Sequence, residues 1–215
     1  IMAFWNAPID DPDHAKNGVR SALAMFEESD KMNEVLKAEA KDEGRKYIPL
    51  RIGAGLNTGV CCVGNMGSDM RFDYSVLGDD VNLAARLEGQ SKTYGVNIVI
   101  GEKTYNAVQD FACLELDRIQ VKGKTVPVDI FCVLGDEKRA QSPEFRAIKS
   151  LNENMITAYR KQQWKLANQR IEELKEIDKN KELEVLCELY EQRISYYKEN
   201  PPGDKWDGSF IATTK

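Results

Sequence analysis

Residues 73–90, DYSVLGDDVNLAARLEGQ, decide how the middle of the chain folds. The stretch begins as a β-type run that ends at Gly78, and two aspartates then open an apolar pattern with helical spacing. Asn82 and Arg86 are four residues apart in that helix, so they share one face. Their neighbours are largely apolar, and an arginine buried without a partner costs several kcal/mol. Both side chains therefore need partners, either in the protein or on a ligand.

The chemistry of these residues leaves two interpretations of Arg86 open. As a structural residue, Arg86 pairs with Asp79 or Glu88 at a contact between chains. As a functional residue, it binds an anionic ligand, and Asn82 beside it orients a hydroxyl or a ring oxygen. Asp79 and Asp80 invite a metal site, but acids at a helix start commonly cap the helix and complement its dipole. Because no third oxygen ligand lies nearby in the sequence, we predict a helix start there and no metal site.

The composition indicates a globular chain with a substantial core. With 215 residues, 42% of them hydrophobic, it is long enough for one medium domain or for a domain with an appendage. A net charge of -5 argues against general nucleic-acid binding, which favours basic stripes. No run of about 18 or more apolar residues is present, so we expect no membrane segment in this chain.

The cysteines and the single histidine predict no metal centre. The five cysteines have no regular spacing and form no CxxC pair, which argues against a zinc site. His14, at a predicted helix start, is interpreted as structural or solvated. Reduced cysteines point to the cytoplasm. The first residues do not form a signal peptide, and because the chain begins inside an apolar run it resembles a fragment, compatible with an upstream membrane anchor or sensor.

Strand-like and helix-like segments alternate along the first two thirds of the chain. This order predicts an α+β fold with a sheet and helices packed on one of its faces. Residues 144–199 contain no glycine or proline and predict about three helices, broken near Lys161 and Asp178, that pack on the domain or on a partner chain. We therefore predict one domain over residues 1–136 and a helical extension over 137–215. The expected strands are 1–5, 50–56, 60–63, 71–77, 96–100, 114–121 and 126–133, and the expected helices are 14–40, 80–94 and 102–108.

Glycines between residues 53 and 67 suggest a phosphate loop, but the spacing excludes one. The pattern GxxxxGK[ST] is absent, and the nearest match, VKGKT at 121–125, has Arg118 where the first glycine would be. Close backbone packing and turns explain the glycines better. Lys122 and Lys124 flank a glycine in a predicted turn between strands. Such lysines are usually solvated, but one would contact phosphate if the turn faces the helix of Arg86.

Several segments together resemble one enzyme family. They are IMAFWNAP (1–8), RIGAGLNTG (51–59), VGNMGSDMRFDYSVLGDDVNLAARLEGQSK (63–92) with the tyrosine that follows, and IQVKGKTVPVDIF (119–131). They resemble the catalytic domain of the class III nucleotidyl cyclases, in particular its bacterial adenylate cyclase branch, over residues 1 to about 134. The resemblance implies a ferredoxin-like mixed β-sheet with packed helices. The tail that ends in NPPGDKWDG (200–208) is similar to an α-helical C-terminal extension of some bacterial members.

The resemblance also implies roles for four residues. Asn82 matches the asparagine that positions the ribose, and Arg86 matches the arginine that stabilises charge on the triphosphate in the transition state. Lys122 matches a lysine that binds the triphosphate. Ser75 lies where the family reads the purine base; it is closer to the threonine of adenylate cyclases than to the cysteine of guanylate cyclases, but it does not settle the base. Asp79 and Asp80 do not match the family's metal-binding positions.

The metal-binding part of the family lies before residue 1 of this chain. Two aspartates and a base-recognising lysine are expected there, so two Mg²⁺ or Mn²⁺ ions would be bound upstream, and this fragment alone would be inactive. The implied reaction converts ATP to 3′,5′-cyclic AMP and pyrophosphate by in-line attack of the ribose 3′-oxygen. It takes place at the interface of a head-to-tail homodimer. The alternatives are a guanylate cyclase and a non-catalytic dimerisation or nucleotide-sensing module.

Overall fold

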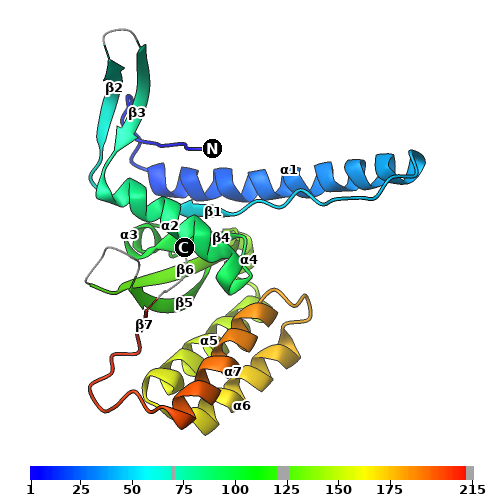
Figure 1. The fold of residues 1–215 in the computed structure, drawn as a ribbon, viewed down its shortest axis with the longest axis vertical. Coiled ribbons are helices and arrows are strands. Elements are labelled where there is room, and N and C mark those ends of the chain that lie inside the picture. The colour runs from blue at the N-terminus through cyan, green and yellow to red at the C-terminus, as the bar shows by residue number, and fades with distance from the viewer. Residues whose placement is uncertain (69–70, 121–125, 212–215) are drawn as a thin grey trace.

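A mixed β-sheet forms the centre of the computed structural model, which describes residues 1–68, 71–120 and 126–211. The sheet has the strand order β1–β4–β6–β5–β7, and a separate antiparallel hairpin, β2–β3, extends away from it (Figure 1). The α+β prediction is therefore confirmed. The strands are β1 (Ala54–Leu56), β2 (Cys62–Ser68), β3 (Arg71–Leu77), β4 (Ile98–Gly101), β5 (Ala112–Gln120), β6 (Val128–Gly135) and β7 (Phe210–Ile211).

The sheet combines antiparallel and parallel pairs. β6 is antiparallel to both β4 and β5, whereas β1 runs parallel to β4 and β7 runs parallel to β5. The helices connect and cover these strands. They are α1 (His14–Asp42), α2 (Asp79–Tyr94), α3 (Glu102–Ala107), α4 (Glu137–Ala140), α5 (Pro143–Arg160), α6 (Trp164–Ile177) and α7 (Glu184–Glu199).

Helices cover both faces of the sheet, so the prediction that they cover one face was wrong. On one face, Ile98 and Ile100 belong to an apolar cluster with Val19 of α1. On the other face, Val99 belongs to a cluster with Leu87 of α2 and with apolar residues of α5, α6 and α7. All four residues of β4 are buried, which is the pattern of a strand covered on both sides.

The N-terminal segment also departs from the prediction, because residues 1–5 form no strand. They pair with none of the described strands, and Ile1, Met2 and Trp5 are exposed. Phe4 instead packs on Tyr74 of the hairpin, with ring centroids 5.8 Å apart. An apolar run becomes a strand only where another strand offers it backbone hydrogen bonds, and this run has no such neighbour in the described part of the chain.

Helix α1 agrees closely with its predicted bounds. Asp13 stands at the N-cap position, but its side chain makes no capping hydrogen bond. The helix extends far beyond the rest of the molecule, and the segment after it returns alongside it toward β1 (Figure 1). Asn33 holds this returning segment, because its amide accepts from the Leu50 nitrogen at 2.7 Å and donates to the Leu50 carbonyl at 2.9 Å.

The C-terminal extension forms helices α5, α6 and α7, with breaks at Lys161 and Asp178 as predicted. Ser142 caps α5 by accepting a hydrogen bond from the Phe145 nitrogen at 3.2 Å, and Pro143 occupies the first turn. None of the helices in the described ranges combines the length and apolarity that crossing a membrane requires.

The three helices pack directly on the sheet and share its core. One cluster of buried residues joins Leu114 of β5 to Ile156, Ile171 and Tyr190 of the extension. Polar contacts reinforce this packing at β5, where Asn152 Nδ2 donates to the backbone carbonyl of the central strand residue Glu115 at 2.8 Å. Of the two predicted packing sites for the extension, the structure therefore shows the one on the domain.

We predict that a chain ending at residue 136 loses its cooperative fold. Removing 137–215 returns a large apolar face to water, and each large side chain exposed costs about 1.5–3 kcal/mol, against a typical domain stability of about 5–15 kcal/mol. Near-ultraviolet circular dichroism and binding of an apolar dye would detect the loss. A chain ending at residue 211 keeps every described element and is the control. An unchanged urea midpoint for the chain ending at 136 would contradict the prediction.

Candidate active site

The candidate site begins at the sharp change of direction between β3 and α2. Gly78 adopts φ 157° and ψ 162°, a conformation that residues with a side chain rarely take. Its carbonyl accepts hydrogen bonds from the nitrogens of Val81 and Asn82, both at 3.2 Å. The glycine therefore lets the helix start directly after the strand, and it places Asn82 in the first turn.

Asp79 and Asp80 occupy the first turn of α2, which confirms the predicted helix start, and Gly78 is the N-cap. The carboxylate of Asp80 binds the loop before β2. Asn57 Nδ2 donates to Asp80 Oδ1 at 3.0 Å and to the Asp80 carbonyl at 3.1 Å. Lys103 Nζ lies 3.6 Å from Asp80 Oδ2. Asp80 thus joins three segments of the chain, which is a structural role.

Asn82 and Arg86 flank the buried face of α2. That face consists of Leu83, Leu87, Ser91 and Tyr94. Asn82 is exposed and Arg86 is half-buried, and neither side chain has a hydrogen-bond or ion-pair partner among the described residues. The structural alternative for Arg86, a pair with Asp79 or Glu88 at a contact between chains, stays a prediction, because a single chain does not test it. The structure leaves both groups available to a ligand.

Two glycines let β1 and the residues before it lie against the backbone of α2. A Cβ on Gly55 would lie 2.2 Å from both the Ala84 carbonyl oxygen and the Glu88 nitrogen. A Cβ on Gly53 would lie 2.4 Å from Ser91 Oγ. These glycines serve close packing, as the sequence predicted, and they hold α2 on both sides of Arg86.

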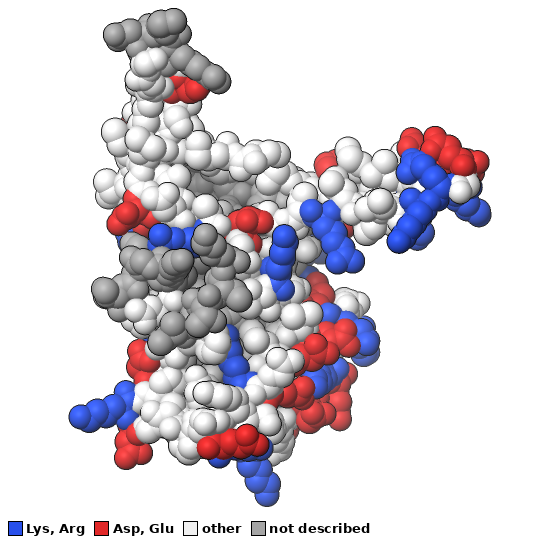
Figure 2. Space-filling view, viewed as in Figure 1, with Lys and Arg blue, Asp and Glu red and all other residues white. Residues whose placement is uncertain are grey.

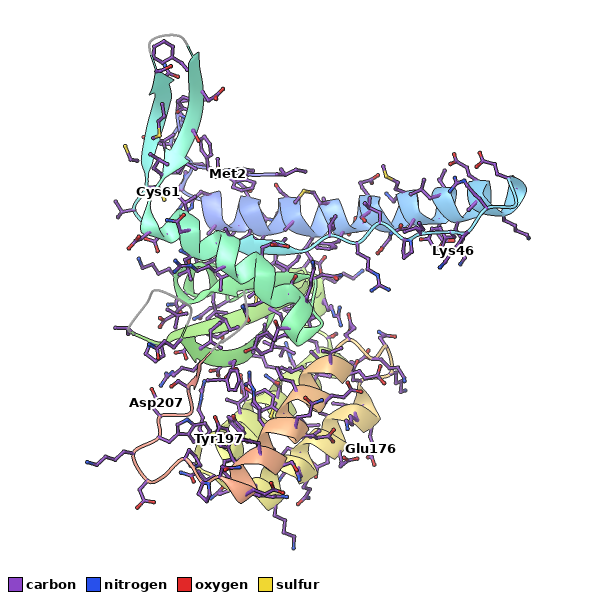
Figure 3. All side chains as sticks on the ribbon, viewed as in Figure 1. Met2, Lys46, Cys61, Glu176, Tyr197 and Asp207 are labelled. Carbon is purple, nitrogen blue, oxygen red and sulfur yellow. The ribbon has the colours of Figure 1, made fainter. Side chains whose placement is uncertain are left out.

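Ser75 lies on the hairpin, in register with Gly64 on β2. The residue is half-buried and precedes the Gly78 turn by three positions, so one continuous strand–turn–helix unit carries Ser75, Asn82 and Arg86. The hairpin base, where Cys61 lies, is next to the start of α2 (Figure 3). A Cβ on Gly78 would lie 3.5 Å from Cys61 Cα. Of the four predicted site residues, the structure places Ser75, Asn82 and Arg86. The fourth, Lys122, lies outside the described residues.

The histidine and the cysteines lie on other parts of the fold or are buried. His14 starts α1 and is half-buried. The five cysteines are all free; Cys61 and Cys62 are exposed, and the other three are buried. Burial raises the pKa of the Cys113 thiol to about 12, so it remains protonated at neutral pH. In residues 1–68, 71–120 and 126–211, no group of three or more His, Cys, Asp or Glu residues could hold a metal ion.

The sequence did not point to one buried polar group beneath α2. Tyr94, at the C-terminal end of the helix, donates a hydrogen bond to Asp117 Oδ2 of β5 at 2.6 Å, and Arg193 Nη1 of α7 donates to the same oxygen at 2.5 Å. The signal in the sequence was a charged residue among the apolar positions of β5, Asp117, and another among those of α7, Arg193. The sequence could not show that these two residues pair, because 76 residues separate them.

Comparison with known proteins supports the family. The model of the adenylate and guanylate cyclase catalytic domain matches residues 2–135. The chain is 32% identical over 145 residues to adenylate cyclase 1 of Rhizobium meliloti (strain 1021), covering 67% of this chain and 21% of that protein. It is 30% identical over 136 residues to an adenylate cyclase of Anabaena cylindrica, covering 61% and 26%. The crystal structure of the adenylyl cyclase CyaB from P. aeruginosa aligns with a TM-score of 0.52 and 35% identity, covering 62% of this chain and 65% of that one.

The chain therefore belongs to the class III nucleotidyl cyclases, as the motifs around α2 predicted. The likeness to CyaB extends to the fold, so the expected cyclase core of a mixed sheet with packed helices is confirmed. The chain spans only about a fifth to a quarter of the length of the two curated relatives.

We predict opposite effects of alanine at two glycines near α2. Gly55→Ala drives a methyl group into the backbone of α2, and such overpacking costs about 1–3 kcal/mol of unfolding free energy. Gly89→Ala is the matched control, because a Cβ there meets no atom within 4 Å and alanine favours the helix by about 0.5–1 kcal/mol. Urea unfolding of both variants measures the difference. Equal midpoints would show that β1 does not hold α2.

Proposed function

We propose that this chain is the nucleotide-binding part of an adenylate cyclase that converts ATP to 3′,5′-cyclic AMP and pyrophosphate. The observation that carries the proposal is the pair Asn82 and Arg86, which flank the buried face of a firmly packed helix and have no partner among the described residues. A fixed amide and a fixed guanidinium without protein partners suit a ligand that has both a sugar hydroxyl and phosphates.

Each residue would contribute a distinct part of the chemistry. Asn82 would orient the ribose, so that its 3′-oxygen is aligned for attack on the α-phosphorus, which is a positioning effect. Arg86 would bind the charge that develops on the triphosphate as pyrophosphate leaves; a lost donor of this kind typically costs about 3–4 kcal/mol of transition-state stabilisation. Lys122 would be a second cation for the triphosphate. The half-buried position of Arg86 strengthens its interaction, because less water screens the charge.

Adenine is the base that we assign to the substrate. Ser75 stands at the position where the family reads the base, and a serine hydroxyl can donate to or accept from a base edge. The curated relatives reported above are adenylate cyclases. Because the family also contains guanylate cyclases, GTP is the alternative substrate that an experiment must compare.

The two divalent ions that the class implies do not fit the described residues. The carboxylate of Asp80, in the first turn of α2, already accepts a hydrogen bond from Asn57 and pairs with Lys103. The described part of the chain has no cluster of three ligating side chains. We therefore assign the binding of Mg²⁺ or Mn²⁺ to residues that precede this stretch in the full protein. The residues of this chain bind the nucleotide.

A head-to-tail homodimer would complete the site, with one protomer supplying the metal ligands and its partner supplying Ser75, Asn82 and Arg86. The protruding hairpin supports this arrangement. Val60 and Phe72 are 90% and 63% exposed, and Leu77 is also exposed. Figure 2 shows few charged side chains over the described part of the hairpin, whereas charges gather on the extension and at the far end of α1. An exposed apolar surface of this kind is typical of a protein contact. We place this catalytic part in the cytoplasm.

We predict that the full-length protein, supplied with Mg²⁺ or Mn²⁺ and an equal mixture of ATP and GTP, forms cyclic AMP as its main product. Chromatography of the products measures both cyclic nucleotides, and sedimentation gives the mass of the active species, which we expect to be a dimer. Cyclic GMP alone would establish a guanylate cyclase. Nucleotide binding without any cyclic product would establish a non-catalytic sensing module.

We predict that Arg86→Ala lowers kcat by about 100-fold or more while the KM for ATP changes by less than about fivefold, because the guanidinium acts mainly on the transition state. Lys92→Ala is the matched control. It removes a cation from the exposed side of the same helix, away from the proposed nucleotide, and should leave both constants unchanged. Equal losses in turnover and in nucleotide binding would contradict the role proposed for Arg86.

A further inference from the structure

The helical extension reaches beneath α2 through one buried arginine. The side chains of Arg193 and Asp117 are 6% and 1% exposed, and Arg193 Nη1 donates to Asp117 Oδ2 at 2.5 Å. The Tyr94 hydroxyl donates to the same carboxylate oxygen at 2.6 Å, and Arg193 Nη2 lies 3.4 Å from that hydroxyl. Three elements that are distant in sequence, α2, β5 and α7, therefore meet at one carboxylate.

A fourth element closes this group from the other side. The segment after α7 runs back to the sheet and ends as β7 beside β5 (Figure 1). The guanidinium carbon of Arg193 lies 3.8 Å from the centre of the Phe210 ring on β7. Strand β7 pairs with Ile119 and Gln120, the residues of β5 that directly precede the segment containing Lys122. The extension thus contacts the C-terminal end of α2, the helix that carries Asn82 and Arg86. It also contacts the C-terminal end of β5, the strand that precedes Lys122 in the sequence.

The contact at Tyr94 fixes how α2 lies on the sheet. Tyr94 continues the buried face of Leu83 and Leu87, and it lies eight positions after Arg86, which is about 12 Å along the helix axis. Next to it, Gly95 has a positive φ of 67° and would place a Cβ only 2.4 Å from Val185 Cβ of α7. A hydrogen bond and a close packing contact therefore hold the C-terminal end of α2 against the extension. Rotation or sliding of the helix, which would displace Asn82 and Arg86, breaks both.

We propose that the C-terminal extension positions the nucleotide-binding helix of the cyclase, with Tyr94 and Arg193 as positioning residues for Asn82 and Arg86. This inference rests on the proposed function for its effect on turnover, and on the contacts themselves for its effect on α2. It assigns the extension a part in catalysis that needs no contact with the nucleotide. Small displacements of groups that orient a substrate cost up to about 100-fold in rate.

Two tyrosines allow a matched test. Tyr94→Phe removes only the hydroxyl that joins α2 to Asp117. Tyr190→Phe removes an equally buried hydroxyl that joins α7 to β5 by donating to the Leu116 carbonyl at 2.8 Å; its distance to Asp117 Oδ1 is 3.5 Å. Both variants keep the aromatic ring and the Arg193–Asp117 pair, so both should fold. Substitution of Arg193 itself would leave a buried carboxylate unpaired and is a poorer test, because the variant is expected to unfold.

In the full-length protein we expect Tyr94→Phe to lower kcat for ATP about tenfold, with the KM for ATP changed by less than about twofold. Tyr190→Phe should keep kcat within about twofold of the unmodified protein, although both variants lower the urea midpoint by a similar amount. Equal values of kcat for the two variants would overturn the proposal, because a merely structural role affects both alike.

Hydrogen exchange separates this inference from the proposed function. We expect amides of residues 79–94 to exchange faster in Tyr94→Phe than in Tyr190→Phe. If the unmodified protein forms neither cyclic AMP nor cyclic GMP, the proposed function fails, and the exchange result alone decides whether the extension positions α2. Equal exchange in the two variants would overturn the inference even in an active enzyme.

Discussion

The backbone of β1 lies so close to α2 at Gly55 that the space between them has no room for a single methyl group. This approach determines where the helix sits, and the helix determines where an amide and a guanidinium stand. Side-chain packing alone tolerates small shifts, because rotamers adjust, but direct contact between backbone segments does not. Gly53 and Gly55 act on one side of α2, and the turn at Gly78 acts at its start. The position of Arg86 is therefore defined by residues that would never contact a ligand.

The buried ion pair between Arg193 and Asp117 has the complementary role at the other end of the helix. Such a pair contributes little net stability, because removing two charges from water offsets most of their attraction. Its effect is to make one arrangement of the surrounding elements much more favourable than its neighbours, since any shift leaves a charge without its partner. Tyr94 shares the carboxylate and so couples α2 to that arrangement. The pKa of the Tyr94 hydroxyl is raised well above its usual value, first because burial disfavours the ionised form. The charge of Asp117 raises this pKa further, because an ionised Tyr94 would be repelled by the carboxylate to which the neutral hydroxyl donates.

Features set by local chemistry could be predicted from the sequence. The start of α2 follows from Gly78 and two acids, and the breaks at Lys161 and Asp178 were found because the flanking periodicity is strong. Features that depend on a distant partner could not. The run 1–5 resembles a strand but has no neighbour in the described chain, and β7, only two residues long, exists because β5 is beside it. The motif includes Ser75, Asn82, Arg86 and Tyr94, but it does not show what Tyr94 contacts, and Arg193 looked like an ordinary helix position.

The shared core of the sheet and the three C-terminal helices has a consequence for the design of chimeric cyclases. A designer who follows the family boundary would join a new output or regulatory module near residue 136, in the middle of a continuous apolar cluster. The packing argues instead for a junction no earlier than β7 (Phe210–Ile211), the last strand within the described residues. The smallest transferable unit of this cyclase then includes its helices, and chimeras that exchange them would combine surfaces that did not evolve together.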